Sequence, residues 1–419
     1  MDMEEIQTNA QKPKESKSGG RGRIAVLWVM SVVLAAAAAV LLTHMFTWKA
    51  ATKKYRDEDG HMFFALRQEM EIIREHGFYY KDDEQMLTDA ALKGTLQAIA
   101  EATGDNYATY YTEAEYAELK KQNERVFTGI GILTRINDGG DVEILEVYQD
   151  TPAAEAGLLP GDIIKEINGK AFGGETLGEF LANLHAEDGA ENAFVILRGE
   201  DTLNFTIIAR VVHTPAVSYR MLTDTIGCVH ILSFHGSCVE ETKQAIQTLR
   251  ESGMKELVLD LRDNLGGSLD DAIKIADIFL PKNYIVTTLR SRTGSVKEYK
   301  TQNSGMDIKT VLLVNELSAS ASELLAGAMK DYDAAYLIGT RTYGKGIVQS
   351  FYEVEETKGW LKLTTDAYYS PNGVCVQDEG ITPDLIVALP EEADRYEIDR
   401  IPAELDTQIQ AAIAYLEGK

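Results

Sequence analysis

The stretch Asn315–Asp331 reads NELSASASELLAGAMKD and follows an apolar run, VLLV at residues 311–314, that is typical of a buried strand. Ser320 and Glu323 have the spacing of a capping box at a helix start. The residues after Ser320 continue with the apolar face of a helix, made by Leu324, Leu325, Ala328 and Met329. Ser320 is therefore predicted at a strand-to-helix turn, where free backbone N–H groups stabilise negative charge. This position suits a serine nucleophile.

A serine hydroxyl needs a neighbouring group that accepts its proton before it can attack a carbonyl. His230 and His235 are the histidines expected in the same domain as Ser320. A further candidate is Lys345, which lies between two glycines before a predicted strand. To act as a base near pH 7, its amine must lose about three units from an ordinary pKa of about 10.4, through burial. Gln349 could orient this amine, and serine–lysine pairs are a known variant of the triad.

Other interpretations of the same residues stay open. Ser318 and Ser322 share the turn with Ser320, so either could be the helix cap. A lysine between glycines is more commonly a solvated turn residue. Residues 339–346, GTRTYGKG, approach a phosphate-binding loop but lack the Ser or Thr after Lys345 that holds magnesium. The segment after this lysine alternates like a strand, so nucleotide binding is not predicted.

The two motifs NExSASASE and YGKGxVQ together resemble the carboxyl-terminal processing, or tail-specific, serine peptidases. The resemblance implies that Ser320 is the nucleophile, Lys345 the general base and Gln349 the residue that orients the lysine. It also implies a serine endopeptidase that cleaves proteins near their C-termini and needs no metal or cofactor. The expected fold is an α/β catalytic core, crotonase-like and built from ββα units, with an inserted PDZ domain.

A second strand–turn–helix unit is predicted around DLRDNLGG at residues 260–267. In the resembling family this segment supplies one amide of the oxyanion hole, and the residue after the nucleophile supplies the other. The resemblance therefore implies Gly266 or Gly267, together with Ala321. Without it, the same glycines would be taken as a tight turn and helix cap.

Residues 125–212 alternate like strands and resemble a PDZ domain through TGIGI at 128–132 and TPAAEAGLLPGD at 151–162. A glycine loop of this kind offers backbone N–H groups to a terminal carboxylate, and an adjacent strand edge accepts an extended peptide. The predicted peptide-binding residues are Gly129, Ile130, Gly131 and Ile132. The domain is expected to capture substrate tails or to gate the site, although glycine pairs alone could mark hairpin turns.

The chain also contains an apolar run at residues 24–46 that holds no Asp, Glu, Lys or Arg. This run is long enough to cross a bilayer, so it is predicted to be an uncleaved signal anchor. Arg21 and Arg23 before it indicate a cytoplasmic tail and an extracytoplasmic catalytic part at the cell membrane. The remaining predicted parts are a helical region at 47–124, the catalytic domain at 213–390 and a C-terminal helical segment at 391–419, with an amphipathic helix over 402–417.

The composition limits the partners. The formal net charge of −25 argues against nucleic acid. The expected partners are proteins with accessible C-terminal tails, the lipid bilayer and, through the terminal helices, a second copy in a homodimer. Three cysteines make no disulfide framework, although a Cys228–Cys238 pair stays open. Two competing functions are a non-catalytic, membrane-tethered PDZ scaffold and a serine–histidine hydrolase that uses His235.

Overall fold

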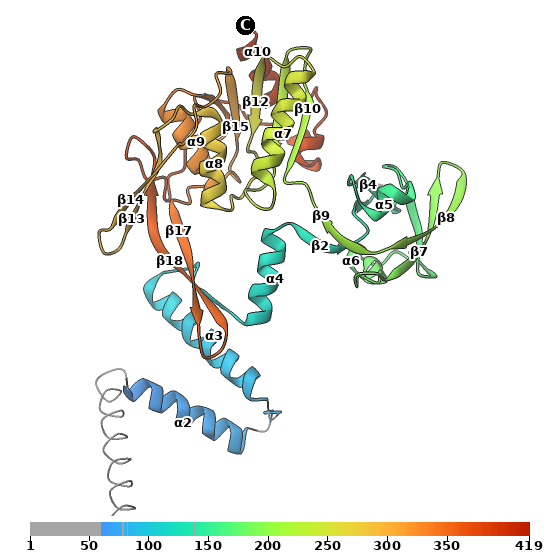
Figure 1. Ribbon diagram of the computed structural model, residues 1–419. Helices are drawn as coiled ribbons and strands as arrows, with labels where there is room; N and C mark the ends of the chain where they lie inside the picture. The colour runs from blue at the N-terminus through green and yellow to red at the C-terminus, as the bar shows by residue number, and fades with distance from the viewer. Residues whose placement is uncertain (1–59, 78, 82, 138) are drawn as a thin grey trace, which may run out of the picture. The chain divides into compact units, whose positions relative to one another are not determined.

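The computed structural model describes residues 60–419 except 78, 82 and 138 (Figure 1). The predicted cytoplasmic tail and signal anchor, residues 1–23 and 24–46, lie outside the described residues. Within the described part, no helix has the length and apolar character needed to cross a bilayer. The chain divides into two compact units, and the boundary between them in the sequence falls after Ala90.

The first unit contains α2 (Gly60–His76) and the start of α3 (Glu84–Thr103). Both helices were predicted, and α2 ends directly before Gly77, as the sequence indicated. Arg74 and Glu84 join the two helices by an ion pair of 2.6 Å.

A six-stranded sheet forms the centre of the second unit, and it is parallel except at its first strand. Its strands, in spatial order, are β10 (Val217–Met221), β11 (Ile226–Ile231), β12 (Glu256–Asp260), β15 (Thr310–Val314), β16 (Tyr336–Gly339) and β19 (Leu385–Ile386). All five residues of β15, TVLLV, are buried. A parallel strand that is covered on both faces needs such a continuous apolar run.

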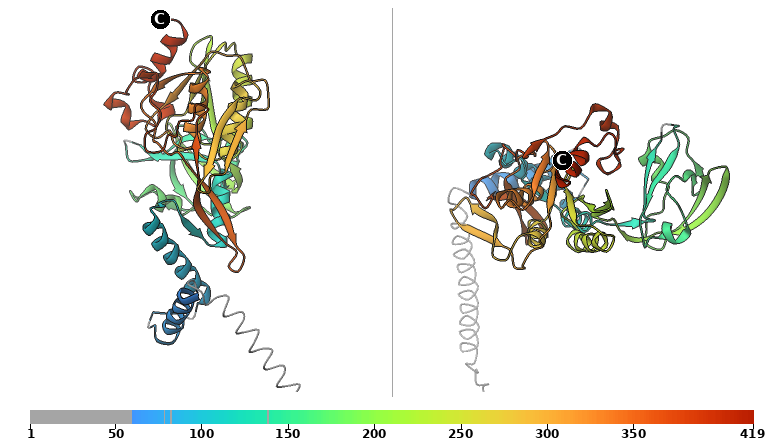
Figure 2. Two further views of the ribbon diagram at one scale, coloured as in Figure 1. Left: turned by 90° about the vertical axis from the view of Figure 1, so that its left-hand side faces the viewer. Right: turned by 90° about the horizontal axis from the view of Figure 1, so that it is seen from above.

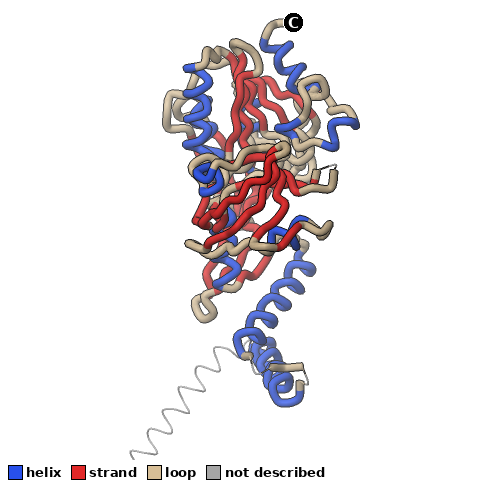
Figure 3. The backbone as a smooth tube through the Cα atoms, turned by 90° about the vertical axis from the view of Figure 1, so that its right-hand side faces the viewer, coloured by secondary structure: helices blue, strands red, loops and turns tan. Residues whose placement is uncertain are grey.

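Helices cover both faces of this sheet (Figures 2 and 3). On one face lie α7 (Cys238–Glu251), α8 (Leu269–Phe279) and α9 (Ala321–Asp331). On the other face lies α10 (Thr407–Leu416). Because side chains alternate along a strand, Leu312 and Val314 of β15 join the core on the α9 side, while Val311 and Leu313 pack with α10. The predicted α/β core is confirmed at this level, and its crotonase-like arrangement stays a prediction.

A second, antiparallel sheet is organised around the long strand β18 (Gly359–Tyr369), which pairs with three other strands. Its members are β1 (Thr109–Tyr111), β13 (Ile285–Ser291), β14 (Val296–Lys300) and β17 (Ile347–Val354). Strand β17 begins directly after the Gly-Lys-Gly motif. Lys345 therefore lies just before this sheet, and Gln349 lies within it.

The expected PDZ strands are present. A two-stranded ribbon, β2 (Val126–Gly129) with β9 (Arg210–His213), leads to a sheet with its own apolar core. That sheet consists of β3 (Ile132–Ile136), β4 (Val142–Val147), β5 (Ile163–Ile167), β6 (Lys170–Ala171), β7 (Glu191–Arg198) and β8 (Asp201–Ile208). Two short helices, α5 (Pro152–Ala156) and α6 (Leu177–Leu181), complete it.

Two expectations about the terminal segments were wrong in part. The region 47–124 was predicted to be helical, yet Thr109–Tyr111 forms strand β1, which pairs with β18 before α4 (Glu113–Asn123) begins. The C-terminal helix begins at Thr407 and not at residue 402, because Asp406 caps it by accepting the Ile409 N–H at 3.0 Å. Short 3₁₀ helices at Glu391–Arg395 and Ile398–Arg400 precede it.

The sequence left a Cys228–Cys238 disulfide open. All three cysteines are free, so this pair does not form, although both residues are buried. A capping box begins α4, where Thr112 and Glu115 exchange hydrogen bonds of 3.2 and 2.9 Å.

Candidate active site

Ser320 lies between β15, a strand of the central sheet, and α9, at the N-terminal cap of this helix. Its backbone has φ 56° and ψ −111°, a left-handed conformation that costs free energy in a residue with a side chain. The neighbouring serines hold this turn in place: Ser318 Oγ donates to the Leu261 carbonyl and Ser322 Oγ to the Asn264 carbonyl, both at 2.8 Å. Both are fully buried, and Ser320 forms the predicted capping box with Glu323, while its hydroxyl donates a hydrogen bond to no described residue. Ser318 and Ser322 therefore have structural roles, and the hydroxyl proton of Ser320 stays available.

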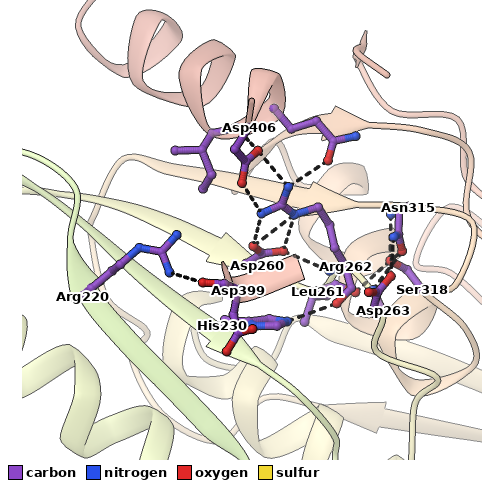
Figure 4. Close-up of polar contacts among 12 residues, drawn as sticks. Arg220, His230, Asp260, Leu261, Arg262, Asp263, Asn315, Ser318, Asp399 and Asp406 are labelled. Carbon is purple, nitrogen blue, oxygen red and sulfur yellow. Dashed lines mark hydrogen bonds and ion pairs between the residues drawn. The ribbon is translucent and has the colours of Figure 1, made fainter. Parts of the chain in front are cut away.

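The loop after β12 is tied to the same turn. Asn315 donates from Nδ2 to Asp263 at 2.6 Å, and its Oδ1 accepts the Asp263 N–H at 2.9 Å. Figure 4 shows this pair beside a buried cluster around Arg262, which has no exposed surface. Arg262 contacts Asp260 at 2.7 Å and Asp406, the cap of α10, at 3.0 Å. The cluster thus joins the central sheet to the C-terminal helix.

Charge pairing keeps this cluster ionised in the protein interior. Burial alone would raise the pKa of Asp260, but the adjacent Arg262 guanidinium holds it below the usual range. The pKa of Arg262 is raised well above its ordinary value, because the attraction of Asp260 and Asp406 outweighs the effect of burial. Arg262 therefore provides the positive charge that both Asp260 and Asp406 contact.

Glu323 joins the Ser320 turn to the Gly-Lys-Gly segment. This side chain is fully buried, and its carboxylate accepts four hydrogen bonds. Oε2 accepts the N–H groups of Ser320 and Lys345, at 2.9 and 2.8 Å. Oε1 accepts the Gly344 N–H and the Thr342 hydroxyl, each at 2.7 Å. The carboxylate therefore fixes the backbone of the predicted nucleophile and the backbone of the predicted base relative to one another.

Tyr368 makes a second connection between the same two residues. Its hydroxyl lies 2.9 Å from the Ser320 carbonyl oxygen and 2.8 Å from the Lys345 carbonyl oxygen. Burial raises the pKa of this phenol well above its ordinary value, so the group stays a protonated donor. Ser320 and Lys345 are thus bridged through their amides by Glu323 and through their carbonyls by Tyr368.

Lys345 and Ser320 line one cavity of about 820 Å³. Burial is the main cause that lowers the pKa of the half-buried Lys345 amine, and the positive charge of Lys362, in the same cavity, lowers it further. Attraction by Glu323 opposes these effects. Lys345 Nζ lies 4.5 Å from the centre of the Tyr107 ring and makes no hydrogen bond or ion pair with any described residue. The cavity therefore shifts the pKa of this amine in the direction that a lysine base requires.

Residues 225–387 match Peptidase family S41, and residues 143–198 match the PDZ domain family. The chain is 31% identical to the carboxy-terminal-processing protease of Bartonella bacilliformis, over 92% of this chain and 88% of that protein. It is also 31% identical to a CtpA-like serine protease of Staphylococcus haemolyticus, over 93% and 78% of the two chains. The chain belongs to peptidase family S41. It is a serine peptidase of the carboxyl-terminal processing group with a PDZ domain.

A solved structure of an S41 protease from Bacteroides fragilis has the same fold. It is 18% identical to this peptidase, with a TM-score of 0.52, and the match covers 81% of this chain and 91% of that chain.

Of the two glycines predicted for the oxyanion hole of the peptidase, Gly266 lies against the Ser320 turn and Gly267 lies against Phe234 and His235. A Cβ atom at Gly266 would come within 2.7 Å of the Ala319 carbonyl oxygen, so only glycine fits there. The Gly266 N–H donates to Asn264 at 2.9 Å. The N–H groups of Gly267 and Ala321, in contrast, have no acceptor among the described residues.

Gln349 and His235 also line the cavity of the peptidase. Gln349 Nε2 donates to Thr364 Oγ1 at 3.3 Å, and the side chain does not contact the Lys345 amine by a hydrogen bond. His235 is half-buried beside Gly267, and burial lowers its pKa. His230 lies in the buried cluster instead, with Nε2 at 3.1 Å from the Arg262 carbonyl oxygen.

Of the predicted peptide-binding residues, Ile130 and Gly131 form the loop between β2 and β3 of the PDZ domain, Gly129 ends β2 and Ile132 begins β3. The N–H groups of Ile130 and Gly131 have no acceptor among the described residues, while their carbonyls accept from Ala153 and Tyr148. Gly131 has φ +84° and packs so closely on Thr151 that a Cβ atom would lie 2.4 Å away. Strand β3 lies at an edge of its sheet, where it pairs with β4 alone among the described strands.

Several residues of the site escaped the sequence analysis. They are Tyr107, Lys362, Thr364 and Tyr368, and Glu323 was predicted only as a helix cap. The signals that could have found them are the position of Glu323 directly after SASAS and the position of Lys362, Thr364 and Tyr368 in the segment KLTTDAY.

Proposed function

We propose that this S41 peptidase cleaves polypeptides with a serine–lysine dyad, in which Ser320 attacks the peptide carbonyl and neutral Lys345 accepts the hydroxyl proton. The observation that carries the proposal is the pair of bridges through Glu323 and Tyr368, which hold these two residues beside one cavity. The proton passes from Ser320 Oγ to Lys345 Nζ and is later given to the leaving amine. Water then hydrolyses the acyl-enzyme by the same route.

The developing oxyanion is proposed to be held by the N–H groups of Gly267 and Ala321. Their lack of other acceptors supports this choice, since a donor already engaged elsewhere gives less stabilisation. Gly266 has the different role of packing against the Ser320 turn while its N–H is engaged by Asn264. Removal of one oxyanion donor typically lowers kcat by about 10²–10³.

The PDZ domain is proposed to capture substrate C-termini. The free N–H groups of Ile130 and Gly131 suit a terminal carboxylate, and the open edge of β3 suits the residues before it. Gly129 and Ile132 frame this loop as the last residue of β2 and the first of β3. The substrates would accordingly be proteins with accessible tails.

Membrane anchoring belongs to the proposal as well. The apolar run at residues 24–46, with arginines before it, supports a single-pass anchor at the cell membrane and an extracytoplasmic peptidase. Fractionation of cells that express the full chain tests this: the protein should stay in the membrane fraction after an alkaline carbonate wash. Recovery in the soluble fraction would contradict the anchor.

The dyad has one competitor, because His235 lines the same cavity with a lowered pKa and could serve as a neutral base. The proposed function is tested by incubating the full chain with an unfolded protein that bears an apolar C-terminal tail. The wild-type protein should release C-terminal fragments and react with a fluorophosphonate at Ser320, and Ser320→Ala should do neither. Cleavage by Ser320→Ala at the wild-type rate would exclude Ser320 as the nucleophile.

A further inference from the structure

A tight turn at residues 104–108, between α3 and β1, lies against both Lys345 and the strand that faces Gln349. Asp105 organises this turn: its Oδ1 accepts the Tyr107 N–H at 3.1 Å, and its carbonyl accepts the Ala108 N–H at 3.1 Å. Immediately after the turn, β1 pairs with β18, with Thr109 opposite Lys362. The turn is therefore fixed to the same sheet as β17, the strand that begins two residues after Lys345.

Asp105 reaches Gln349 through Thr364. The carboxylate accepts the Thr364 N–H at 3.0 Å and the Thr364 hydroxyl at 2.8 Å. Since a threonine hydroxyl has one proton and gives it to Asp105, its oxygen can only accept from Gln349, whose Nε2 lies 3.3 Å away. This order fixes the side-chain amide, with its NH₂ group on Thr364 and its carbonyl oxygen left as an acceptor. An acceptor of this kind is what a lysine amine needs in order to be oriented.

Tyr107 acts on the lysine directly. The Lys345 amine lies over the face of the Tyr107 ring at 4.5 Å, which is a cation–π distance. No described residue gives this amine a hydrogen bond or a carboxylate, because the oxygens of Glu323 are engaged by backbone N–H groups and by Thr342. The ring face therefore stabilises the protonated amine, which is the form that arises when the lysine takes the serine proton.

We propose that the turn at 104–108 positions the base of the peptidase: Tyr107 holds the protonated Lys345 amine, and Asp105, through Thr364, aims the Gln349 carbonyl at it. Tyr107 and Asp105 are positioning residues, and neither lines the cavity that Ser320 and Lys345 share. This inference rests on the proposed serine–lysine mechanism and adds to the dyad the contact of Tyr107 with Lys345 and the hydrogen bonds that join Asp105, Thr364 and Gln349. It also gives the region before the PDZ domain a role in the chemistry.

The Tyr107 contact is tested in the full chain with Tyr107→Leu and Tyr107→Phe. Leucine keeps an apolar cover over Lys345 but removes the ring face, whereas phenylalanine keeps the face. The readout is the pH dependence of Lys345 acetylation by trace acetic anhydride, followed by mass spectrometry, which reports the amine's pKa without any turnover. Loss of the ring should lower this pKa by about half a unit, the size expected for one exposed cation–π contact.

Tyr107→Phe should keep the wild-type profile. An unchanged profile in Tyr107→Leu, or an equal shift in both variants, would overturn the role of the ring. Because labelling needs no cleavage, this outcome is independent of the proposed function, which fails separately if Ser320→Ala still cleaves or if the wild-type protein does not cleave.

The hydrogen bonds that join Asp105 to Gln349 through Thr364, here called the relay, are tested with two variants. Thr364→Val keeps the β-branched shape and removes the hydroxyl, and Thr364→Ser keeps the hydroxyl. Valine should lower kcat about tenfold and leave KM within about twofold, since only the orientation of Gln349 changes. Serine should restore kcat, and Asp105→Asn should resemble valine. If the valine variant loses activity in proportion to its loss of folded protein, or if serine and valine behave alike, the relay is refuted.

Discussion

The backbone N–H groups of Ser320 and Lys345 donate to the same oxygen, Oε2 of Glu323, at 2.9 and 2.8 Å. Two turns that are distant in the sequence are therefore aligned by one buried carboxylate. Ser320 and Lys345 line one cavity, and these hydrogen bonds hold their backbones in place beside it. Substitutions in this bridge should therefore affect turnover more strongly than substrate binding.

Glu323→Gln should lower kcat by about 10²-fold, because a side-chain NH₂ group replaces an acceptor and leaves two buried donors without a partner. The free energy of unfolding should fall by about 2–4 kcal/mol. Steady-state kinetics and denaturant unfolding measure both effects. Glu316→Gln is the matched control, since Glu316 accepts the Thr340 hydroxyl at an exposed position. A kcat as high as that of the control would show that the bridge does not align the site.

Tyr368→Phe removes the hydroxyl that lies between the carbonyls of Ser320 and Lys345. The expected result is a fall in kcat of about tenfold, equal to about 1.4 kcal/mol of transition-state stabilisation, with KM nearly unchanged. Tyr352→Phe removes a hydroxyl from a tyrosine that is 51% exposed and serves as the control. If KM rises and kcat stays constant, Tyr368 contacts substrate and does not align the dyad.

Arg262→Met should cost about 3–5 kcal/mol of unfolding free energy, because Asp260 and Asp406 would remain as buried charges without a partner. Chemical denaturation measures the loss. Lys243→Met breaks the surface ion pair with Glu240 and should change stability by less than about 0.5 kcal/mol. Similar losses in the two variants would mean that the buried cluster contributes nothing beyond a surface pair.

Lys362→Met should move the acidic limb of the kcat/KM profile to higher pH. The positive charge of Lys362, after burial, lowers the pKa of Lys345, so its removal raises that pKa and reduces the fraction of neutral base at pH 7. Activity at pH 7 should fall and recover as the pH rises. Lys362→Arg keeps the charge and should keep the limb in place. A limb that does not move in Lys362→Met, measured with a substrate that lacks carboxylates near the cleavage site, would show that Lys362 does not tune the base.

Local patterns in the sequence predicted a large part of this fold. The apolar run before Ser320 and the helix that follows it were placed correctly, since each depends on neighbouring residues. The start of α10 was misplaced because the apolar period already begins at Leu405, while Asp406 imposes the cap after it. Strand β1 was missed because only its pairing with β18 makes it a strand.

The sequence predicted candidate site residues as motifs but did not predict the contacts between them. Ser320, Lys345 and Gln349 line one cavity, and their catalytic roles belong to the proposed function. The contacts that hold them join residues far apart in the chain: Glu323 meets Lys345 across 22 positions, and Asp105 meets Thr364 across 259. Periodicity and spacing contain no information about such pairs. The choice between the N–H groups of Gly266 and Gly267 likewise depends on Asn264, whose hydrogen bond only the structure reveals.

The most direct test of the serine–lysine mechanism compares Lys345→Ala with His235→Ala in a cleavage assay of the full chain on an unfolded protein with an apolar tail. Both residues line the cavity with Ser320, but the mechanism assigns the proton transfer to lysine alone. Lys345→Ala should lose about 10³-fold or more in kcat while folding like the wild type. His235→Ala should keep turnover within about tenfold of the wild-type rate. Full cleavage by Lys345→Ala, or its loss in His235→Ala alone, would contradict the serine–lysine dyad.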